Sequence, residues 1–239
     1  MPIAAVTLDA GGTLFDVAEP VGTTYARIAA AHGILVDAAA ADRGFRTAFA
    51  SAPPMAFPGI SDADRPARER AWWRAVVRAA FGAAATHPAF PACFDALFAH
   101  YAVARAWRVF PEIPGTLEAL RARGLALAVV SNFDARLPPL LAGLGLAPLV
   151  DAVVYSTAVG FAKPDPGIVR TAIRILGVAA ADTLHVGDGP GDVAAARGAG
   201  AHAALLDRRG SGNAAPAGAS VLRSLAALPA LVERLTAHP

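Results

Sequence analysis

The sequence predicts an α/β protein with a Rossmann-like, three-layer α/β/α core around a parallel sheet and an all-helical domain inserted after the first strand. Short apolar runs alternate with helix-like segments along most of the chain, and such alternation is typical of parallel sheets. Between about Asp16 and Phe110 the alternation stops and only helical patterns follow one another. We therefore expect a core of residues 1–15 and 110–239, and a helical insertion of residues 16–109.

Five apolar runs are interpreted as buried strands of the core: Ile3–Asp9, Leu125–Ser131, Asp151–Ser156, Thr183–Gly187 and Ala201–Leu206. Helix-like segments separate or flank them: Gly115–Arg123, Arg136–Gly145, Pro166–Gly177 and Asp192–Gly200. Several of these segments end at a glycine, as helix C-termini often do. The order of these elements predicts helices on both faces of the sheet.

In the insertion, prolines separate four expected helices: Gly22–Gly33, Ala38–Ala50, Asp62–Gly82 and Ala89–Trp107. After the last expected strand, the stretch Gly210–Ser220 is rich in Gly, Ala, Ser and Pro, which predicts a loop. A final helix or turn is expected over Leu222–Thr236.

Composition excludes several classes of protein. The 239 residues are 55% hydrophobic and 17% charged, which is too apolar for a disordered chain. No apolar run reaches the roughly 20 residues of a membrane span, and the amino terminus lacks the basic stretch of a signal peptide. The single cysteine, Cys93, is typical of a reducing cytoplasm. We expect a cytoplasmic protein without a membrane partner; the oligomeric state is not indicated.

A group of arginines in the insertion surrounds Trp72-Trp73, and basic residues beside aromatic ones can indicate nucleic acid binding. However, Arg70, Arg74 and Arg78 are spaced by four, the pattern of one solvated helix face. The net charge of +2 also gives little attraction for a polyanion. We therefore expect no nucleic acid partner.

Polar residues follow three of the expected strands. Asp9 ends the first strand, Ser131-Asn132 ends the second, and Gly187-Asp188 ends the fourth. In an open parallel sheet, ligands bind outside the carboxyl ends of the strands. The sequence therefore predicts that these residues, distant along the chain, converge on one crevice.

The charges at this crevice indicate a cation. Asp9, Asp188 and Asp192 would crowd three carboxylates together, which is unfavourable unless a cation joins them. Mg²⁺ fits this arrangement because it prefers oxygen ligands. Among 21 basic residues, Lys163 is the single lysine.

Four motifs carry a family resemblance. The first is Asp9-Ala10-Gly11-Gly12-Thr13-Leu14, and the others are Ser131-Asn132, Lys163-Pro164 and Gly187-Asp188-Gly189-Pro190-Gly191-Asp192. In order and spacing they resemble the four motifs of the haloacid dehalogenase (HAD)-like hydrolase superfamily, over nearly the whole chain. The helical insertion is similar in position to the type-one cap of that superfamily.

Shorter stretches give a narrower resemblance. The segments Gly44-Phe45-Arg46, Trp72-Trp73 and Ser131-Asn132-Phe133-Asp134 are similar to the subgroup of haloacid dehalogenase-like hydrolase domain-containing protein 3. The superfamily resemblance implies a phosphatase-like hydrolase acting on a small phosphorylated substrate.

The resemblance also implies a role for each motif residue. Asp9 is the expected nucleophile, forming an aspartyl-phosphate that divides one difficult step into two. Asp9, the backbone carbonyl of Gly11 and Asp188 are the expected Mg²⁺ ligands. Asp192 is expected to act on the waters of the metal or on Lys163. The ammonium of Lys163 would keep Asp9 ionised and neutralise charge on the phosphoryl group.

The remaining motif residues are expected at the substrate. The hydroxyls of Thr13 and Ser131 would bind phosphoryl oxygens and assist catalysis. The amide of Asn132 is expected to contact the substrate or to support a neighbouring residue. Gly12, beside Gly11, would let the backbone approach the substrate closely.

One position departs from the phosphatase pattern. Many phosphatases of the superfamily carry a second aspartate two residues after the nucleophile as general acid and base, and this chain has Gly11 there. Loss of such a group typically lowers the rate by 10²–10⁴-fold. Two alternatives therefore stay open: a 2-haloacid dehalogenase, and a metal- or ligand-binding protein with impaired catalysis.

The dehalogenase alternative rests on a first motif that is similar and on Arg46, which could bind a carboxylate or halide as the arginine of those enzymes does. In that alternative Asp9 would attack carbon, and no metal would be needed. Asp188 is evidence against it, because dehalogenases generally carry uncharged residues at that position.

Overall fold

The computed structural model describes residues 2–210 and 219–237 of the chain, and we treat its two compact units separately. The core unit consists of Met1–Asp16, Ala56–Gly59 and Val109–Pro239. The helical unit consists of Val17–Met55 and Ile60–Arg108. The short segment Ala56–Gly59 is thus part of the core unit although it lies between helices of the other unit in sequence.

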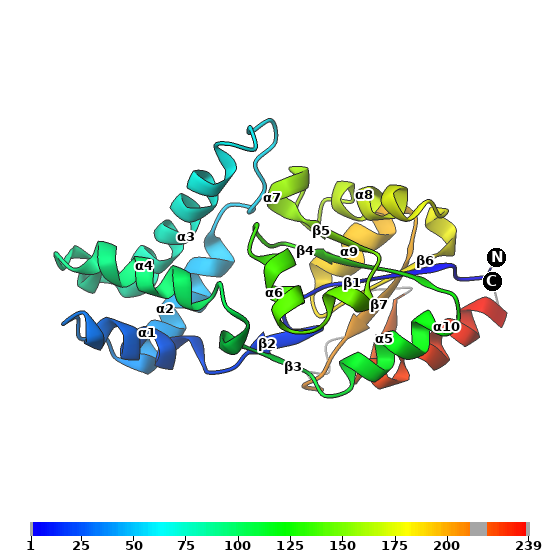
Figure 1. Cartoon of the computed structure of the whole chain (residues 1–239), viewed down its shortest axis with the longest axis horizontal. Helices are drawn as coiled ribbons and strands as arrows, with labels where there is room; N and C mark the ends of the chain where they lie inside the picture. The colour runs from blue at the N-terminus through cyan, green and yellow to red at the C-terminus, as the bar shows by residue number, and fades with distance from the viewer. Residues whose placement is uncertain (1, 211–218, 238–239) are drawn as a thin grey trace. The chain divides into compact units, whose positions relative to one another are not determined.

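A six-stranded parallel sheet forms the centre of the core unit, in the order β5-β4-β1-β6-β7-β8 (Figure 1). Its strands are β1 (Ala5–Leu8), β4 (Ala126–Ser131), β5 (Ala152–Tyr155), β6 (Thr183–Gly187), β7 (His202–Leu206) and β8 (Ser220–Leu222). The predicted parallel α/β core is confirmed. The edge strand β8 was not expected, because its three residues fall where the composition indicates a loop leading into a helix.

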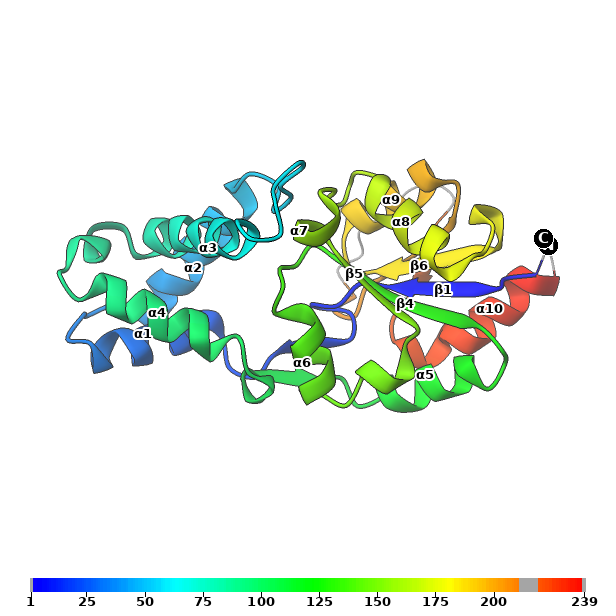
Figure 2. The same ribbon diagram turned by 45° about the horizontal axis from the view of Figure 1, so that its top comes forward.

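Helices cover both faces of this sheet (Figures 1 and 2). On one face lie α8 (Gly167–Leu176) and α9 (Pro190–Ala199), and on the other lie α5 (Ile113–Arg121) and α10 (Leu228–Ala237). The remaining helical elements of the core unit are α6 (Leu137–Gly143), α7 (Ser156–Val159) and the short 3₁₀ helices η3 (Ala147–Leu149), η4 (Ala180–Asp182) and η5 (Leu225–Ala227). The expected three layers are therefore present.

The register of the central strands aligns their carboxyl ends. All four residues of β1 are buried, as expected for a strand with a neighbour on each side and helices on both faces. Leu8 is opposite Val129 of β4 and Val186 of β6. Asp9 follows Leu8 directly, so it leaves the sheet at the same edge as the residues that follow β4 and β6.

The helical unit contains α1 (Val21–Ala31), α2 (Ala38–Ser51), α3 (Arg65–Phe81) and α4 (Phe90–His100), with the 3₁₀ helices η1 (Gly82–Thr86) and η2 (Ala104–Ala106). The chain enters it through β2 (Phe15–Val17) and leaves it through β3 (Trp107–Val109), which pair as a two-stranded sheet. The fourth expected helix, Ala89–Trp107, is too long: α4 ends at His100, and turns, η2 and β3 follow.

Aromatic and aliphatic side chains fill the interior of the helical unit, including Tyr25, Phe81 and Phe94. The arginine row on α3 packs against α4: the guanidinium groups of Arg70 and Arg74 lie 5.2 and 5.1 Å from the centre of the Phe94 ring. Arg70 also forms an ion pair with Asp95. These arginines therefore have partners within their own unit.

Two further points concern the described residues. No helix among them combines the length and the apolar character needed to cross a bilayer. Most of the loop expected over Gly210–Ser220 lies outside the described residues.

Candidate active site

A buried ion pair joins the first and third motifs. The Nζ atom of Lys163 lies 2.6 Å from Oδ1 of Asp9 and also donates to the carbonyl oxygen of Val130 at 3.0 Å. The side chains of Lys163 and Asp9 are only 6% and 12% exposed. A third ammonium contact, at 2.5 Å, reaches Oδ1 of Asp192. The three acceptors match the three N–H donors of the ammonium group.

Asn132 fixes the backbone of Lys163. Its Nδ2 donates to the carbonyl oxygen of Lys163 at 2.8 Å, and its Oδ1 accepts from the amide nitrogen of Lys163 at 2.7 Å. Both ends of the side-chain amide are thus engaged. Of the two roles expected for Asn132, the structure shows support of a neighbouring residue.

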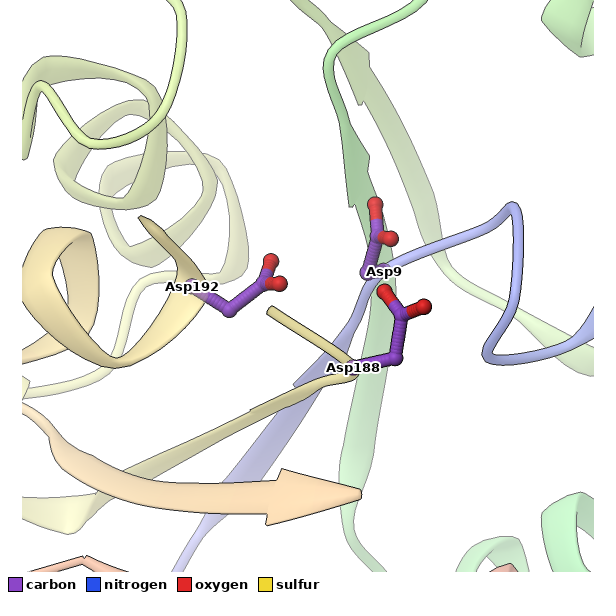
Figure 3. Close-up of side chains that lie close together, drawn as sticks. All are labelled: Asp9, Asp188 and Asp192. Atoms are coloured by element: carbon purple, nitrogen blue, oxygen red, sulfur yellow. The ribbon is translucent and has the colours of Figure 1, made fainter. Parts of the chain in front are cut away.

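Three carboxylates from two strand ends and one helix lie together (Figure 3). Asp9 follows β1, Asp188 follows β6, and Asp192 lies in the first turn of α9; each offers an oxygen within 4.8 Å of the others. Asp9 and Asp192 are buried, whereas Asp188 reaches solvent. The convergence expected from the strand ends is therefore observed for these acids.

Two glycines make room for the carboxylates. A Cβ atom added to Gly12 would lie 2.2 Å from Oδ2 of Asp188, and one added to Gly187 would lie 2.1 Å from Cγ of Asp192. Gly12 also has a φ of 74°, which side chains other than glycine rarely adopt. Close approach of the acids therefore requires glycine at both positions, and the positive φ is a second reason at Gly12.

Gly11 is in a different situation. Its φ is not positive, and a Cβ atom added there would meet nothing within 4 Å. The backbone at this position would therefore accept a side chain. The lack of a carboxylate at position 11 is not a steric requirement of the loop.

Two polar residues behind the site were not expected from the sequence. Thr7 and His185 are register partners on β1 and β6, and Oγ1 of Thr7 lies 2.8 Å from Nδ1 of His185. The Nε2 atom of His185 lies 3.3 Å from Oδ1 of Asp192. Both side chains are buried, 0% and 1% exposed. Their signal in the sequence is a polar residue inside each of two apolar strands.

The hydrogen bonds of Asp192 fix the orientation of its carboxylate group. Oδ1 of Asp192 contacts Lys163 and His185, and Oδ2 accepts the backbone N–H of Gly189 at 3.0 Å. Both oxygens thus have partners in the protein. Of the two roles expected for Asp192, the structure shows the contact with Lys163.

The two candidate hydroxyl residues are both buried. Ser131 ends β4 and is 4% exposed, while Thr13 is 0% exposed. Among the described residues, Oγ1 of Thr13 has no hydrogen-bond partner. A buried hydroxyl without a partner is unfavourable in the ligand-free protein. The amide nitrogen of Gly12 donates to Phe15 at 2.8 Å, so this N–H group is already engaged.

The pKa values of Asp188 and Asp192 are shifted in opposite directions. Partial burial of the carboxyl group, and then the charges of Asp9 and Asp192, raise the pKa of Asp188 to about 7. Burial also disfavours the ionised form of Asp192, but the charge of Lys163 and the hydrogen bond with His185 bring its pKa below the usual range. Burial alone would lower the pKa of Lys163, whereas Asp9 and Asp192 raise it overall.

The donor set fits a hard divalent cation. Carboxylate oxygens are the ligands that Mg²⁺ prefers, and three of them lie within 4.8 Å of one another. One ammonium group leaves this cluster with excess negative charge. Burial is the larger cause of the raised pKa of Asp188, and the charges of Asp9 and Asp192 add to it; a bound cation would offset these charges.

Comparison with known proteins identifies the class to which this fold and site belong. The family model of haloacid dehalogenase-like hydrolases matches residues 3–200. Haloacid dehalogenase-like hydrolase domain-containing protein 3 of Mus musculus is 40% identical over 187 residues, which span 77% of this chain and 73% of that protein. The protein is therefore a hydrolase. It belongs to the haloacid dehalogenase-like hydrolase family, and the narrower resemblance to the domain-containing protein 3 subgroup is confirmed.

Other relatives carry more specific names. A plasmid-encoded phosphoglycolate phosphatase of Cupriavidus necator is 42% identical over 139 residues, which span 56% of this chain and 60% of that protein. The solved structure of an L-2-haloacid dehalogenase matches with a TM-score of 0.72 and 25% identity, covering 98% of this chain and 100% of that chain. The fold is thus shared by phosphatases and dehalogenases.

Proposed function

We propose that the protein is a magnesium-dependent phosphatase that acts on a small phosphorylated substrate through an aspartyl-phosphate on Asp9. The observation that carries this proposal is the position of Asp188, which adds a carboxylate with a raised pKa beside Asp9. Like charges this close are unfavourable unless a cation joins them, which favours a metal-dependent reaction. The phosphatase relative from Cupriavidus necator supports the same reading.

In the first step, a carboxylate oxygen of Asp9 would attack phosphorus while the bond to the leaving oxygen breaks. Lys163 would pair with Asp9 and face the negative charge of the phosphoryl group. The hydroxyls of Thr13 and Ser131 would bind phosphoryl oxygens. Water would then attack the aspartyl-phosphate, releasing inorganic phosphate and restoring Asp9.

Asp9, Asp188 and the backbone carbonyl of Gly11 would hold Mg²⁺, which would neutralise charge on the transferring group when bound. Asp192 would orient Lys163 through the contact described above. Gly11 supplies no general acid, so the leaving oxygen would depart as an anion or take its proton from solvent. We expect good leaving groups to react best.

A dehalogenase reaction is the second candidate, because an L-2-haloacid dehalogenase has the same fold. In that reaction Asp9 would attack carbon and displace halide. Its cap arginine would correspond to Arg46, which in this structure forms an ion pair with Asp42 within the helical unit.

The compartment that we expect for the protein is the reducing cytoplasm, because of the single cysteine Cys93.

A screen of phosphorylated metabolites and aryl phosphates with Mg²⁺, run beside Asp9→Asn, tests the proposal. We expect Mg²⁺-dependent phosphate release by the wild type and none by the variant, because an amide is a poor nucleophile. Halide release from 2-haloacids in EDTA would support the dehalogenase instead. Mg²⁺ binding without turnover of any activated phosphate would support a protein with impaired catalysis.

A further inference from the structure

An arginine outside the four motifs contacts the loop that follows the nucleophile. Arg208 lies just after β7, and its side chain is 19% exposed. Its Nε donates to the carbonyl oxygen of Gly12 at 3.3 Å, and its Nη2 donates to that of Thr13 at 2.8 Å. One planar guanidinium group therefore binds two successive carbonyls of the first motif.

Two other segments hold this guanidinium group in place. Its Nη1 lies 2.5 Å from Oε1 of Glu112, and its Cζ lies 3.7 Å from the centre of the Phe110 ring. Ser224 also donates to Oε1 of Glu112 at 3.3 Å. Burial disfavours the charge of Glu112, but the hydrogen bond from Arg208 brings its pKa below the usual value. Glu112 is thus a carboxylate at neutral pH, suited to accept from the guanidinium group.

The loop is also held from its amide side. Gly12 donates its N–H to Phe15 at 2.8 Å, and Thr13 donates its N–H to Ala10 at 3.2 Å. With both carbonyls bound by Arg208, the amide and the carbonyl of each of these two residues have partners. The same Gly12 is the residue that packs against the carboxylate of Asp188.

We propose that Arg208 is a positioning residue, which holds the loop after Asp9 so that Gly12 stays packed against Asp188. Through this loop it fixes the distance between the nucleophile and the carboxylate that follows β6. Lysine can replace it only in part, because a single ammonium lacks the planar fork that binds two carbonyls and a carboxylate together. Only the kinetic consequence of this inference depends on the proposed phosphatase function.

The test compares Arg208→Met, Arg208→Lys and Glu112→Gln with a control, Arg223→Met. Arg223 is the appropriate control because it pairs with Asp207, the neighbour of Arg208, at 2.5 Å. Within residues 2–210 and 219–237, the hydrogen bonds of Arg223 go to Asp207 and not to the first motif. Hydrogen exchange of the amides of residues 12–15 is measured by mass spectrometry. Circular dichroism melts and p-nitrophenyl phosphate kinetics at varied Mg²⁺ complete the comparison.

We expect exchange of these amides to rise about tenfold in Arg208→Met, the size of a lost hydrogen bond, and less in Arg208→Lys and Glu112→Gln. The control should leave it unchanged. In kinetics, Arg208→Met should lower kcat and raise the Mg²⁺ concentration for half-maximal activity. Arg208→Lys should show a smaller change than Arg208→Met in kcat and in the Mg²⁺ concentration for half-maximal activity.

Unchanged exchange in a folded Arg208→Met, or an equal rise in the control, overturns the inference. So does a wild-type kcat and Mg²⁺ requirement in that variant while the wild type is an active phosphatase. If exchange rises as expected but the wild type hydrolyses no phosphate, the positioning role stands and the proposed function fails.

Discussion

The ammonium group of Lys163 connects two carboxylates that are far apart in sequence: Asp9 is 154 residues away and Asp192 is 29 residues away. The Nζ atom lies 2.6 Å from the first carboxylate and 2.5 Å from the second. One buried ammonium group thus links Asp9, which follows β1, to α9, the helix that begins within the fourth motif.

Replacing this ammonium should disable the site. Lys163→Arg introduces a wider planar fork that cannot meet three acceptors arranged around one nitrogen. We expect turnover of p-nitrophenyl phosphate to fall about 10²–10³-fold, the usual effect of losing one group that stabilises charge in the transition state. Steady-state kinetics would measure this. Kinetics close to wild type would show that Lys163 is only a structural charge.

The raised pKa of Asp188 predicts a pH-dependent stability. A carboxyl group whose pKa is about 7 in the folded protein and about 4 when unfolded favours folding at low pH. That contribution is lost as pH rises to 7. In EDTA at pH 8, Asp188→Asn should therefore melt above the wild type, and the difference should vanish below about pH 4.

Mg²⁺ should reverse the order of the melting temperatures of the wild type and Asp188→Asn at pH 8. At pH 8, Mg²⁺ should raise the melting temperature of the wild type, since a ligand that binds only the folded state stabilises it, and Asp188→Asn should respond little. Glu233→Gln, which removes an exposed carboxylate paired with Arg123, is the matched control and should behave as wild type. An Asp188→Asn protein that melts below wild type in EDTA at pH 8 contradicts this account.

We expect the residue at position 11 to determine which leaving groups react. Without a general acid, aryl phosphates should be cleaved far faster than alkyl phosphates. Gly11→Asp should reduce this difference by raising alkyl phosphate turnover, because the position has an ordinary φ and open space for a side chain. Gly11→Ala is the matched control, since it changes the backbone in the same way without adding a carboxyl group.

Rates for a series of phosphate esters of different leaving-group pKa test whether the lack of a general acid at position 11 limits alkyl phosphate turnover. If the wild type cleaves alkyl and aryl esters equally while chemistry limits the rate, another residue supplies the proton. If Gly11→Ala raises alkyl turnover as much as Gly11→Asp, the carboxyl group is not the cause.

We expect replacement of His185 to change stability and turnover through its contact with Asp192. His185→Leu removes the buried partner of that carboxylate, which typically costs about 1–3 kcal/mol of stability. We also expect slower turnover, because Asp192 would orient Lys163 less well. His185→Gln keeps an N–H group that can donate to Asp192, so it should restore part of both properties. Chemical denaturation and kinetics on the three proteins test this; equal losses in both variants would rule out the hydrogen bond as the cause.

Most of the core could be predicted because its strands are buried on both sides. The runs around Val6, Val129 and Val186 are nearly continuous stretches of apolar residues, and polar residues appear where each strand ends. By contrast, β2, β3 and β8 have only three residues each, too few for a pattern. The helix expected up to Trp107 failed for a related reason, since apolar and aromatic residues continue beyond His100 after the helix has ended.

The support of the site was harder to predict than its acids. Asp9, Asp188 and Lys163 are distinctive residue types at strand ends and in motifs. Arg208, however, binds backbone carbonyls of Gly12 and Thr13, and every residue of any chain has a carbonyl. The amide of Asn132 likewise binds the backbone of Lys163. No pattern of side chains in the sequence predicts such hydrogen bonds to the backbone.

The central place of β1 has a consequence for how the chain is made. This strand is synthesised early, but its neighbours in the sheet, β4 and β6, begin at Ala126 and Thr183. An apolar strand therefore leaves the ribosome long before either of its partners exists, and such exposed strands are prone to aggregate. The residues of the helical unit are synthesised in the interval. The three carboxylates can meet only after Asp192 has emerged, so we expect a chain interrupted before that residue to be inactive.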